Sequence, residues 1–267
     1  MTGTNEPLGG PLDEQSVLDA LAAFGDRGLG RPLSVVAITA STNDDARRAL
    51  DAGAPHGATF LADHQTAGRG REGRPWHSPP GSHLYLSSLL RLPLGPEGLA
   101  PFALAAGLAV ARTVDAALGG ERARIKWPND VYLADHKVAG VLVEAQSRAG
   151  AAQAALVVGV GLNVAAATFP EGFRVPATSL ASEGATVGRA WVAGALLHHL
   201  GDVTLQYLDG GLGSLLDAIR ARDHLHGRAV MAGGVAGKAV GIGERGELLV
   251  EGATGVVPVV SGEVRWS

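Results

Sequence analysis

Apolar residues recur at helical spacing in several parts of the chain. Between residues 13 and 24, apolar side chains three or four positions apart would form one face of a short helix. The polar run 41–45 has the residue types that open helices, so we expect a helix over residues 46–52. The same spacing predicts longer helices over residues 100–118, 189–208 and 213–223.

Short apolar runs with β-strand character lie between these helices, at residues 34–38, 59–63, 84–92, 124–127, 131–133, 137–144 and 155–162. Several follow one another with only a turn between them, as in hairpins. This arrangement favours an α+β fold with a mixed, largely antiparallel sheet over a doubly wound parallel fold.

The last part of the chain contains short strands alone, at residues 228–232, 237–243, 247–251, 255–260 and 263–266. Glycines and charged residues separate them, which predicts a small β-barrel. We therefore expect an N-terminal extension with one short helix (residues 1–33), a main domain (residues 34–222) and a small barrel domain (residues 223–267).

Composition excludes several kinds of chemistry. The chain has no cysteine, so disulfides, thiolate metal sites and cysteine nucleophiles are ruled out, and we expect a reducing, cytoplasmic location. The net charge of −4 argues against a broadly basic nucleic-acid surface. Residues 1–12 lack signal-peptide features, and Arg112 and Asp115 interrupt the longest apolar stretch, so we expect no membrane partner.

The strongest candidate for chemistry is the segment 68–76 (GRGREGRPW), in which arginines alternate with glycines. Glycine allows close backbone approach, and arginine offers permanently charged donors for phosphate or carboxylate. A solvated basic loop or a nucleic-acid-binding segment would have the same composition. The position between two strands favours a loop that closes over an anionic ligand.

Three shorter segments have weaker signals. Residues 126–130 (KWPND) combine a cation, an amide and a carboxylate, or form an ordinary turn. Lys137 opens an apolar strand, where it either lies exposed at the strand end or binds an anion. Residues 159–163 (GVGLN) indicate a bulge or close approach to a ligand. The nine histidines form no convincing metal set.

Taken in order, these segments and residues 41–43 (STN) resemble the motifs of the biotin–protein ligase family. The match includes Gln65 before the arginine–glycine segment and residues 137–144 (KVAGVLVE). The resemblance implies a catalytic domain like those of lipoate ligases and class II aminoacyl-tRNA synthetases, followed by a small SH3-like C-terminal domain. Because the extension before residue 34 is short, the resemblance is to monofunctional members without a DNA-binding domain.

The activity that the resemblance implies has two steps. ATP and Mg²⁺ would convert biotin to biotinyl-5′-AMP, and a lysine of a biotin carboxyl carrier protein would then take the biotinyl group. No nucleic acid takes part, and the chain would be a monomer or weak homodimer. A lipoate or octanoate ligase or transferase on the same fold, and a biotin-responsive DNA-binding regulator, are the alternative functions.

The resemblance also assigns roles to individual residues. Biotin would be bound by Ser41, Thr42, Asn43, Gln65, Arg69, Gly70, Arg71, Lys137 and Gly159. ATP would be bound by Arg71, Arg74, Trp76, Lys126, Asn129, Lys137 and Asn163. Catalysis would depend on Lys137, Arg69 and Lys126, with Asp130 as a candidate Mg²⁺ ligand. Residues 176–180 have no aromatic side chain, whereas some members place one near the adenine.

Overall fold

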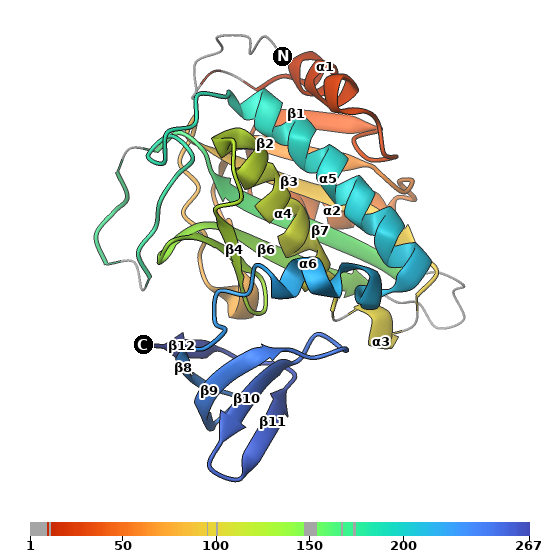
Figure 1. Ribbon diagram of the computed structural model, residues 1–267. Coiled ribbons are helices and arrows are strands. Elements are labelled where there is room, and N and C mark those ends of the chain that lie inside the picture. Colours follow the sequence, from red (N-terminus) through yellow and green to blue (C-terminus); the bar gives the residue numbers. More distant parts are fainter. Residues whose placement is uncertain are drawn as a thin grey trace.

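The computed structural model describes residues 10, 12–94, 96–99, 101–146, 154–166, 168–172 and 175–267. Its centre is a seven-stranded sheet (Figure 1). In spatial order the strands are β1 (Leu33–Thr39), β2 (Thr59–Gln65), β3 (His83–Leu92), β7 (Ala154–Asn163), β6 (His136–Gln146), β5 (Asp130–Leu133) and β4 (Ala123–Lys126). β1 and β2 run parallel and the other neighbours are antiparallel, which confirms the predicted mixed, largely antiparallel sheet.

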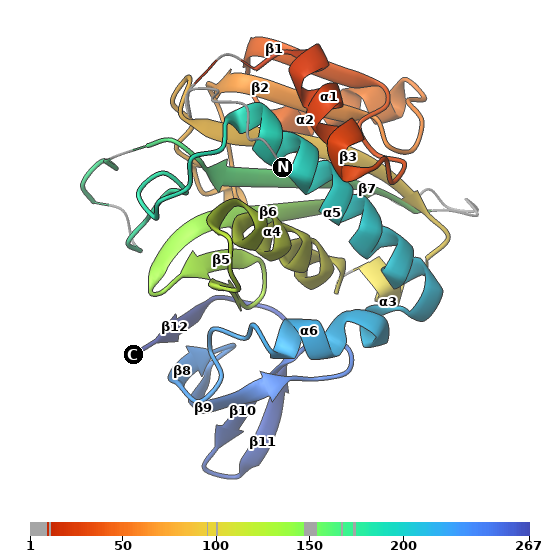
Figure 2. The same ribbon diagram turned by 45° about the horizontal axis from the view of Figure 1, so that its top comes forward.

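Helices cover both faces of this sheet. Its central strands β3 and β7 are buried at nearly every position, so side chains on both faces are shielded from water. α4 (Phe102–Leu118) and α5 (Arg189–Gly210) cross one face, and α1 (Glu14–Phe24) packs on α5 (Figure 2). α2 (Thr42–Asp51) packs on the other face. Successive residues of β3 separate accordingly: Leu90 lies in the main core and Leu89 in the smaller core beneath α2.

Two predicted helices need correction. α2 begins at Thr42, not at residue 46, and the side chain of Ser41 makes no capping hydrogen bond. The polar residues at its start are buried and face the sheet, where they have hydrogen-bond partners other than the helix end. The segment predicted as one helix over residues 213–223 forms a 3₁₀ turn, η2 (Leu212–Leu215), and a short helix, α6 (Leu216–Arg220).

The C-terminal strands form a separate five-stranded antiparallel sheet, as predicted. They are β8 (Ala229–Ala232), β9 (Val235–Ile242), β10 (Leu248–Gly252), β11 (Gly255–Val259) and β12 (Val264–Trp266), in the order β11-β10-β9-β8-β12. Hydrogen bonds join this unit to the main domain: Trp127 Nε1 donates to Gly246 O (2.8 Å), and Arg220 Nε donates to Ile242 O (2.8 Å). The strand β12 lies against the main domain beside the site described next, because the ring of Trp266 packs edge-on against that of Tyr132 with 5.6 Å between the ring centres.

The remaining short elements are the 3₁₀ turn η1 (Arg71–Gly73) and the helix α3 (Pro96–Leu99). Among the described residues, no helix is both long and apolar enough to cross a membrane. The apolar, Ala-rich helix α4 is buried between the sheet and α5, which agrees with its composition.

Candidate functional site

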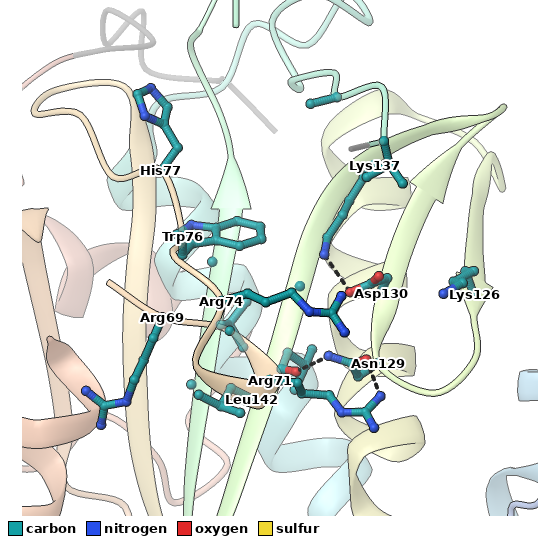
Figure 3. A pocket seen from close by; sticks show the side chains of 18 of the residues that line it. Arg69, Arg71, Arg74, Trp76, His77, Lys126, Asn129, Asp130, Lys137 and Leu142 are labelled. Atoms are coloured by element: carbon teal, nitrogen blue, oxygen red, sulfur yellow. Dashed lines mark hydrogen bonds and ion pairs between the residues drawn. The ribbon is translucent and has the colours of Figure 1, made fainter. Parts of the chain in front are cut away.

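A cavity of about 690 Å³ lies between the arginine–glycine loop, the strands β5 to β7 and the end of β12 (Figure 3). Every site residue expected from the motifs lines it: Ser41, Thr42, Asn43, Gln65, Arg69, Gly70, Arg71, Arg74, Trp76, Lys126, Asn129, Asp130, Lys137, Gly159 and Asn163. Segments as far apart in the sequence as Ser41 and Asn163 thus contribute to one surface. Next to α2 the lining has the uncharged polar side chains of residues 41–43 and Gln65, with Arg69 paired to Asp44 beside them, and the other charged lining residues lie elsewhere in the cavity.

The polar end is built from hydrogen-bonded neutral side chains. The backbone N–H and the hydroxyl of Thr42 both donate to Gln65 Oε1 (2.9 and 3.2 Å). Gln65 Nε2 in turn donates to Ser78 Oγ (3.1 Å). Asn43 Nδ2 donates to the carboxylate of Glu144 (2.7 Å), and Ser87 Oγ donates to Asn43 Oδ1 (2.6 Å). These side chains are held in fixed orientations before any ligand enters.

Glycines on β6 and β7 make room for two of the lining side chains. A Cβ atom at Gly159 would lie 2.0 Å from Asn43 Oδ1, and one at Gly161 would lie 2.4 Å from the Trp76 indole. A Cβ at Gly140 would come within 3.0 Å of the same indole. The close approach predicted at residues 159–163 is thus made, in this structure, by Asn43 and Trp76.

Two lysines face the cavity from β6 and β4, the strands on either side of β5. Lys137 Nζ lies 2.7 Å from Asp130 Oδ1 and 5.1 Å from the centre of the Trp76 ring (Figure 3). It is therefore a cavity residue and not a solvated lysine at a strand end. Lys126 Nζ lies 5.1 Å from the centre of the Trp266 ring, and burial lowers the pKa of Lys126 below its usual 10.5.

The three arginines of the loop bind three different elements. Arg71 donates to Asn129 Oδ1 (3.3 Å), in the turn before β5. Arg74 pairs with Glu72 and donates to Glu263 Oε1 (3.3 Å), next to β12. Arg69 donates from both terminal nitrogens to the Asp44 carboxylate of α2 (2.6 and 2.5 Å).

The position of Arg69 differs from the expectation that it runs along the tail of the ligand. Its guanidinium points away from Arg71, Arg74 and Lys137 (Figure 3). The hydrogen bonds between Arg69 and Asp44 raise the pKa of the arginine and lower that of the carboxyl. Arg69 therefore anchors the loop to α2 in this structure.

The amides near the charged end are also engaged. Asn129 Nδ2 donates to Val141 O (2.6 Å), and Asn163 Nδ2 donates to Thr178 O (2.9 Å). Asn163 thus ties the segment after residue 175 to the sheet, a role that its motif did not indicate. Within the described ranges, no group of three or more His, Asp or Glu side chains is arranged to hold a metal.

The motif analysis gave no role to four lining or supporting residues: Ser87, Glu144, Phe169 and Trp266. Ser87 is a buried polar residue inside an apolar strand, and Glu144 ends a matched motif without a role assigned to it. Phe169 lines the cavity, and its ring stacks on that of His83 with 5.8 Å between the ring centres. It is an aromatic lining residue outside the segment 176–180, which has none. Trp266 belongs to a strand that the sequence assigned to a separate unit.

Comparison with known proteins places these features in a family. Residues 35–163 match the model of the biotin/lipoate A/B protein ligase family. A biotin–[acetyl-CoA-carboxylase] ligase of Mycobacterium tuberculosis (strain H37Rv) is 38% identical over 264 residues, which cover 95% of each chain. The chain belongs to the biotin protein ligase family. This confirms the resemblance inferred from the motifs.

Two further similar proteins carry names from the same family. The bifunctional ligase/repressor BirA of Escherichia coli (strain K12) is 35% identical over 213 residues, and the match covers 78% of this chain but 66% of that protein, slightly less than two thirds. The biotin protein ligase from Aquifex aeolicus, solved in complex with biotin and ATP, superposes with a TM-score of 0.75 at 30% identity. That alignment covers 88% of this chain and 98% of the other.

Proposed function

We propose that the protein joins biotin to ATP to form biotinyl-5′-AMP and then transfers the biotinyl group to a lysine of a biotin carboxyl carrier protein. The observation that carries this proposal is the division of one cavity into a neutral hydrogen-bonding end and a cationic end. Biotin has a neutral ureido ring at one end and a carboxylate at the other. The similar Aquifex aeolicus ligase was solved with biotin and ATP together.

The neutral end suits the ureido ring. Ser41, Thr42, Asn43 and Gln65 offer donors and acceptors without net charge. Since hydrogen bonds already fix the side chains of Thr42, Asn43 and Gln65, ligand binding there costs little reorganisation. Gly70 would lie along the ligand, because it has no side chain to obstruct it, and Gly159 leaves the space that the Asn43 side chain needs beside the ligand.

The cationic end suits the reacting groups. In the first step a biotin carboxylate oxygen attacks the α-phosphorus of ATP, and pyrophosphate leaves. Lys137 is the central cation, and we assign it to hold the carboxylate and an α-phosphate oxygen together while stabilising the charge that develops between them. Arg71, Arg74 and Lys126 would neutralise the remaining phosphates.

The aromatic side chain of Trp76 flanks the same region. Trp76 lies on the shelf of glycines in β6 and β7, and its ring faces Lys137. We assign Trp76 to pack against the nucleotide, with Asn129 and Asn163 fixing the surrounding backbone. In the second step the ε-amine of the acceptor lysine attacks the acyl carbon, and AMP leaves with the amine proton lost to solvent.

Magnesium would reach the site with ATP. Mg²⁺ generally keeps several waters and binds phosphates together with one or two carboxylates. Asp130 supplies one carboxylate beside Lys137, so the residues fit a nucleotide-borne ion and not a fully protein-bound one. The ion supplies charge neutralisation of the phosphates, and Lys137 and Lys126 supply the rest.

The alternative functions have less support. A lipoate or octanoate chain would not need the ureido partners at the neutral end, and the similar relatives carry biotin ligase names. We place the reaction in the cytoplasm, where a carboxylase carrier would be available, and expect a monomer or weak homodimer.

The test is transfer to a carrier. The purified chain, ATP, Mg²⁺ and an unmodified biotin carboxyl carrier domain are incubated with biotin, lipoate or octanoate, and the carrier mass is measured. We expect the mass of one biotinyl group on the carrier, absent when its acceptor lysine is replaced by arginine. Modification by lipoate or octanoate, and not by biotin, would contradict the proposal.

A further inference from the structure

The salt bridge between Arg69 and Asp44 joins the arginine–glycine loop to α2. We propose that Asp44 is a positioning residue that docks this loop on α2 before any ligand binds, and thereby slows the escape of biotin and of biotinyl-5′-AMP. The inference rests on the proposed function where it names these ligands. Within the described residues Asp44 does not line the cavity, so it acts through Arg69 and not by touching a ligand.

The segment 68–76 is a hairpin that is closed by its own backbone. Its two arms are joined by hydrogen bonds from Trp76 N–H to Gly68 O (2.8 Å) and from Gly70 N–H to Arg74 O (2.7 Å). Between these hydrogen bonds the arms form an antiparallel bridge. Because the arms are bonded to each other, an anchor on one arm also fixes the other. The side chains that the hairpin presents to the cavity therefore keep their places as long as one arm is held.

The contact with Asp44 is the tightest of the polar contacts described above between the hairpin and other elements. Arg69 donates two hydrogen bonds to the carboxylate (2.6 and 2.5 Å), whereas Arg71 and Arg74 each reach another element through one hydrogen bond of 3.3 Å. A bidentate, charge-assisted pair is stronger than a single long hydrogen bond. The side chains of Arg69 and Asp44 are 27% and 28% exposed, against 46% for Arg74, so solvent weakens their pairing less.

A second carboxylate keeps Arg69 in the same place. Glu144 Oε1, on β6, lies 3.9 Å from the guanidinium of Arg69. The same atom lies 3.9 Å from the guanidinium of Arg47, which also pairs with Asp44. Two carboxylates thus neutralise two arginines. If Arg69 moved to an anionic ligand, the two carboxylates would be left with one arginine between them. The charge of Arg69 is therefore committed to docking the hairpin.

Docking of the hairpin affects how fast a ligand can leave. The hairpin bounds the cavity together with the strands β5 to β7, so the cavity opens when the hairpin moves away. A loop that must break a charged pair in order to open lowers the dissociation rate of what it encloses. An acyl-adenylate is hydrolysed by water, so a closed cavity protects this intermediate until the acceptor lysine arrives.

The experiment compares Asp44→Asn with Asp45→Asn in the full chain. Both aspartates lie in the first turn of α2, and each pairs with the arginine three positions later, Arg47 or Arg48. Both substitutions therefore remove one negative charge from the helix start and one pair along the helix. Asp44→Asn removes, in addition, the contact with Arg69. The difference between the two variants isolates that contact.

Two rates are measured. Without ligand, limited digestion with trypsin is followed at the bond after Arg71, which lies at the tip of the hairpin. With labelled biotin bound, its release is followed after addition of excess unlabelled biotin. We expect both rates to rise about tenfold in Asp44→Asn and to stay unchanged in Asp45→Asn, while thermal unfolding is the same in the two variants.

Two further variants show whether Asp44 acts through Arg69. Addition of Asp44→Asn to Arg69→Gln should change neither rate, because the contact is already lost. Asp44→Glu keeps a carboxylate and should restore most of the slow release. A further increase in the double variant would contradict the inference.

Equal rates in Asp44→Asn and Asp45→Asn would overturn the inference. Slower biotin release in Asp44→Asn would also overturn it, because Arg69 would then leave Asp44 to bind the ligand. Absence of biotin binding by the unsubstituted chain would overturn the proposed function instead. The digestion without ligand would still test the docking in that case, so the two failures are distinguishable.

Discussion

Lys126 lies at the end of β4, with its ammonium group 5.1 Å from the centre of the Trp266 ring. Burial lowers the pKa of Lys126 from 10.5, and the charge of Asp130 offsets part of that effect. A lysine that is buried at a stability cost, in a cavity with other cations, fits a group kept for an anionic ligand.

This predicts opposite effects of Lys126→Met on stability and activity. The folded state holds the lysine proton less tightly than the unfolded chain, so protonated Lys126 destabilises the fold below its folded pKa, and the cost disappears as the pH rises toward 10.5. The variant should be more stable than the unsubstituted chain at pH 7, with a smaller difference at pH 10. Biotin-dependent pyrophosphate exchange should fall about 100-fold.

Urea unfolding of both proteins at the two pH values measures the first effect. A stability difference that grows with pH would contradict the burial argument. Lys238→Met, at an exposed position of β9, is the matched control and should change neither property.

For single residues, the sequence motifs predicted which side chains line the site but not which partners those side chains have. The motifs identified residues that all line one cavity, because their types and order are distinctive. They did not reveal that Asp44 binds Arg69, nor that Asn163 is engaged by Thr178 O. Those partners depend on how distant segments pack, and neither Asp44 nor Thr178 belongs to a motif that suggests the contact.

At the scale of elements, the shelf formed by β6 and β7 is central. Both strands have a largely apolar middle, and both carry glycines where the Trp76 ring lies against them. The strand pattern predicted the sheet, including its antiparallel character. It could not predict the start of α2, because Thr42 and Asn43 have low helix propensity and are placed there by hydrogen bonds to the sheet.

Gly161→Ala tests the shelf. The new Cβ would lie 2.4 Å from the Trp76 indole, so the ring must move and the cavity must change shape. We expect ATP affinity to fall about tenfold or more, because small displacements of a positioning group have large effects. Gly120→Ala is the control, since a Cβ there meets nothing within 4 Å. Equal ATP affinity in both variants would show that Trp76 does not position the nucleotide.

At the scale of the whole molecule, the C-terminal sheet completes the cavity. Trp266 packs edge-on against Tyr132, contacts Lys126 and lines the end away from α2. The sequence predicted this unit as a separate small domain, and its boundary at residue 223 stays a prediction. Its contribution to the site could not be predicted, because strand patterns carry no information on how two sheets dock.

Trp266→Ala should therefore affect the two substrates unequally. Biotin affinity should stay within about twofold, whereas ATP affinity should fall about tenfold, since the aromatic ring and its contact with Lys126 lie at the nucleotide end. Met231→Ala, an exposed side chain on the neighbouring strand β8, is the control. Calorimetric titration with each ligand gives both affinities. Equal weakening of both ligands would contradict the assigned ends of the cavity.

The central claim is that this cavity activates biotin with ATP through Lys137. It is tested most directly by biotin-dependent exchange of labelled pyrophosphate into ATP, with the unsubstituted chain, Lys137→Ala and the exposed-site control Lys238→Ala. The account predicts exchange that requires biotin, is not supported by lipoate, falls at least about 100-fold in Lys137→Ala and is unchanged in the control. Exchange supported by lipoate instead of biotin, or unaffected by the loss of Lys137, would contradict it.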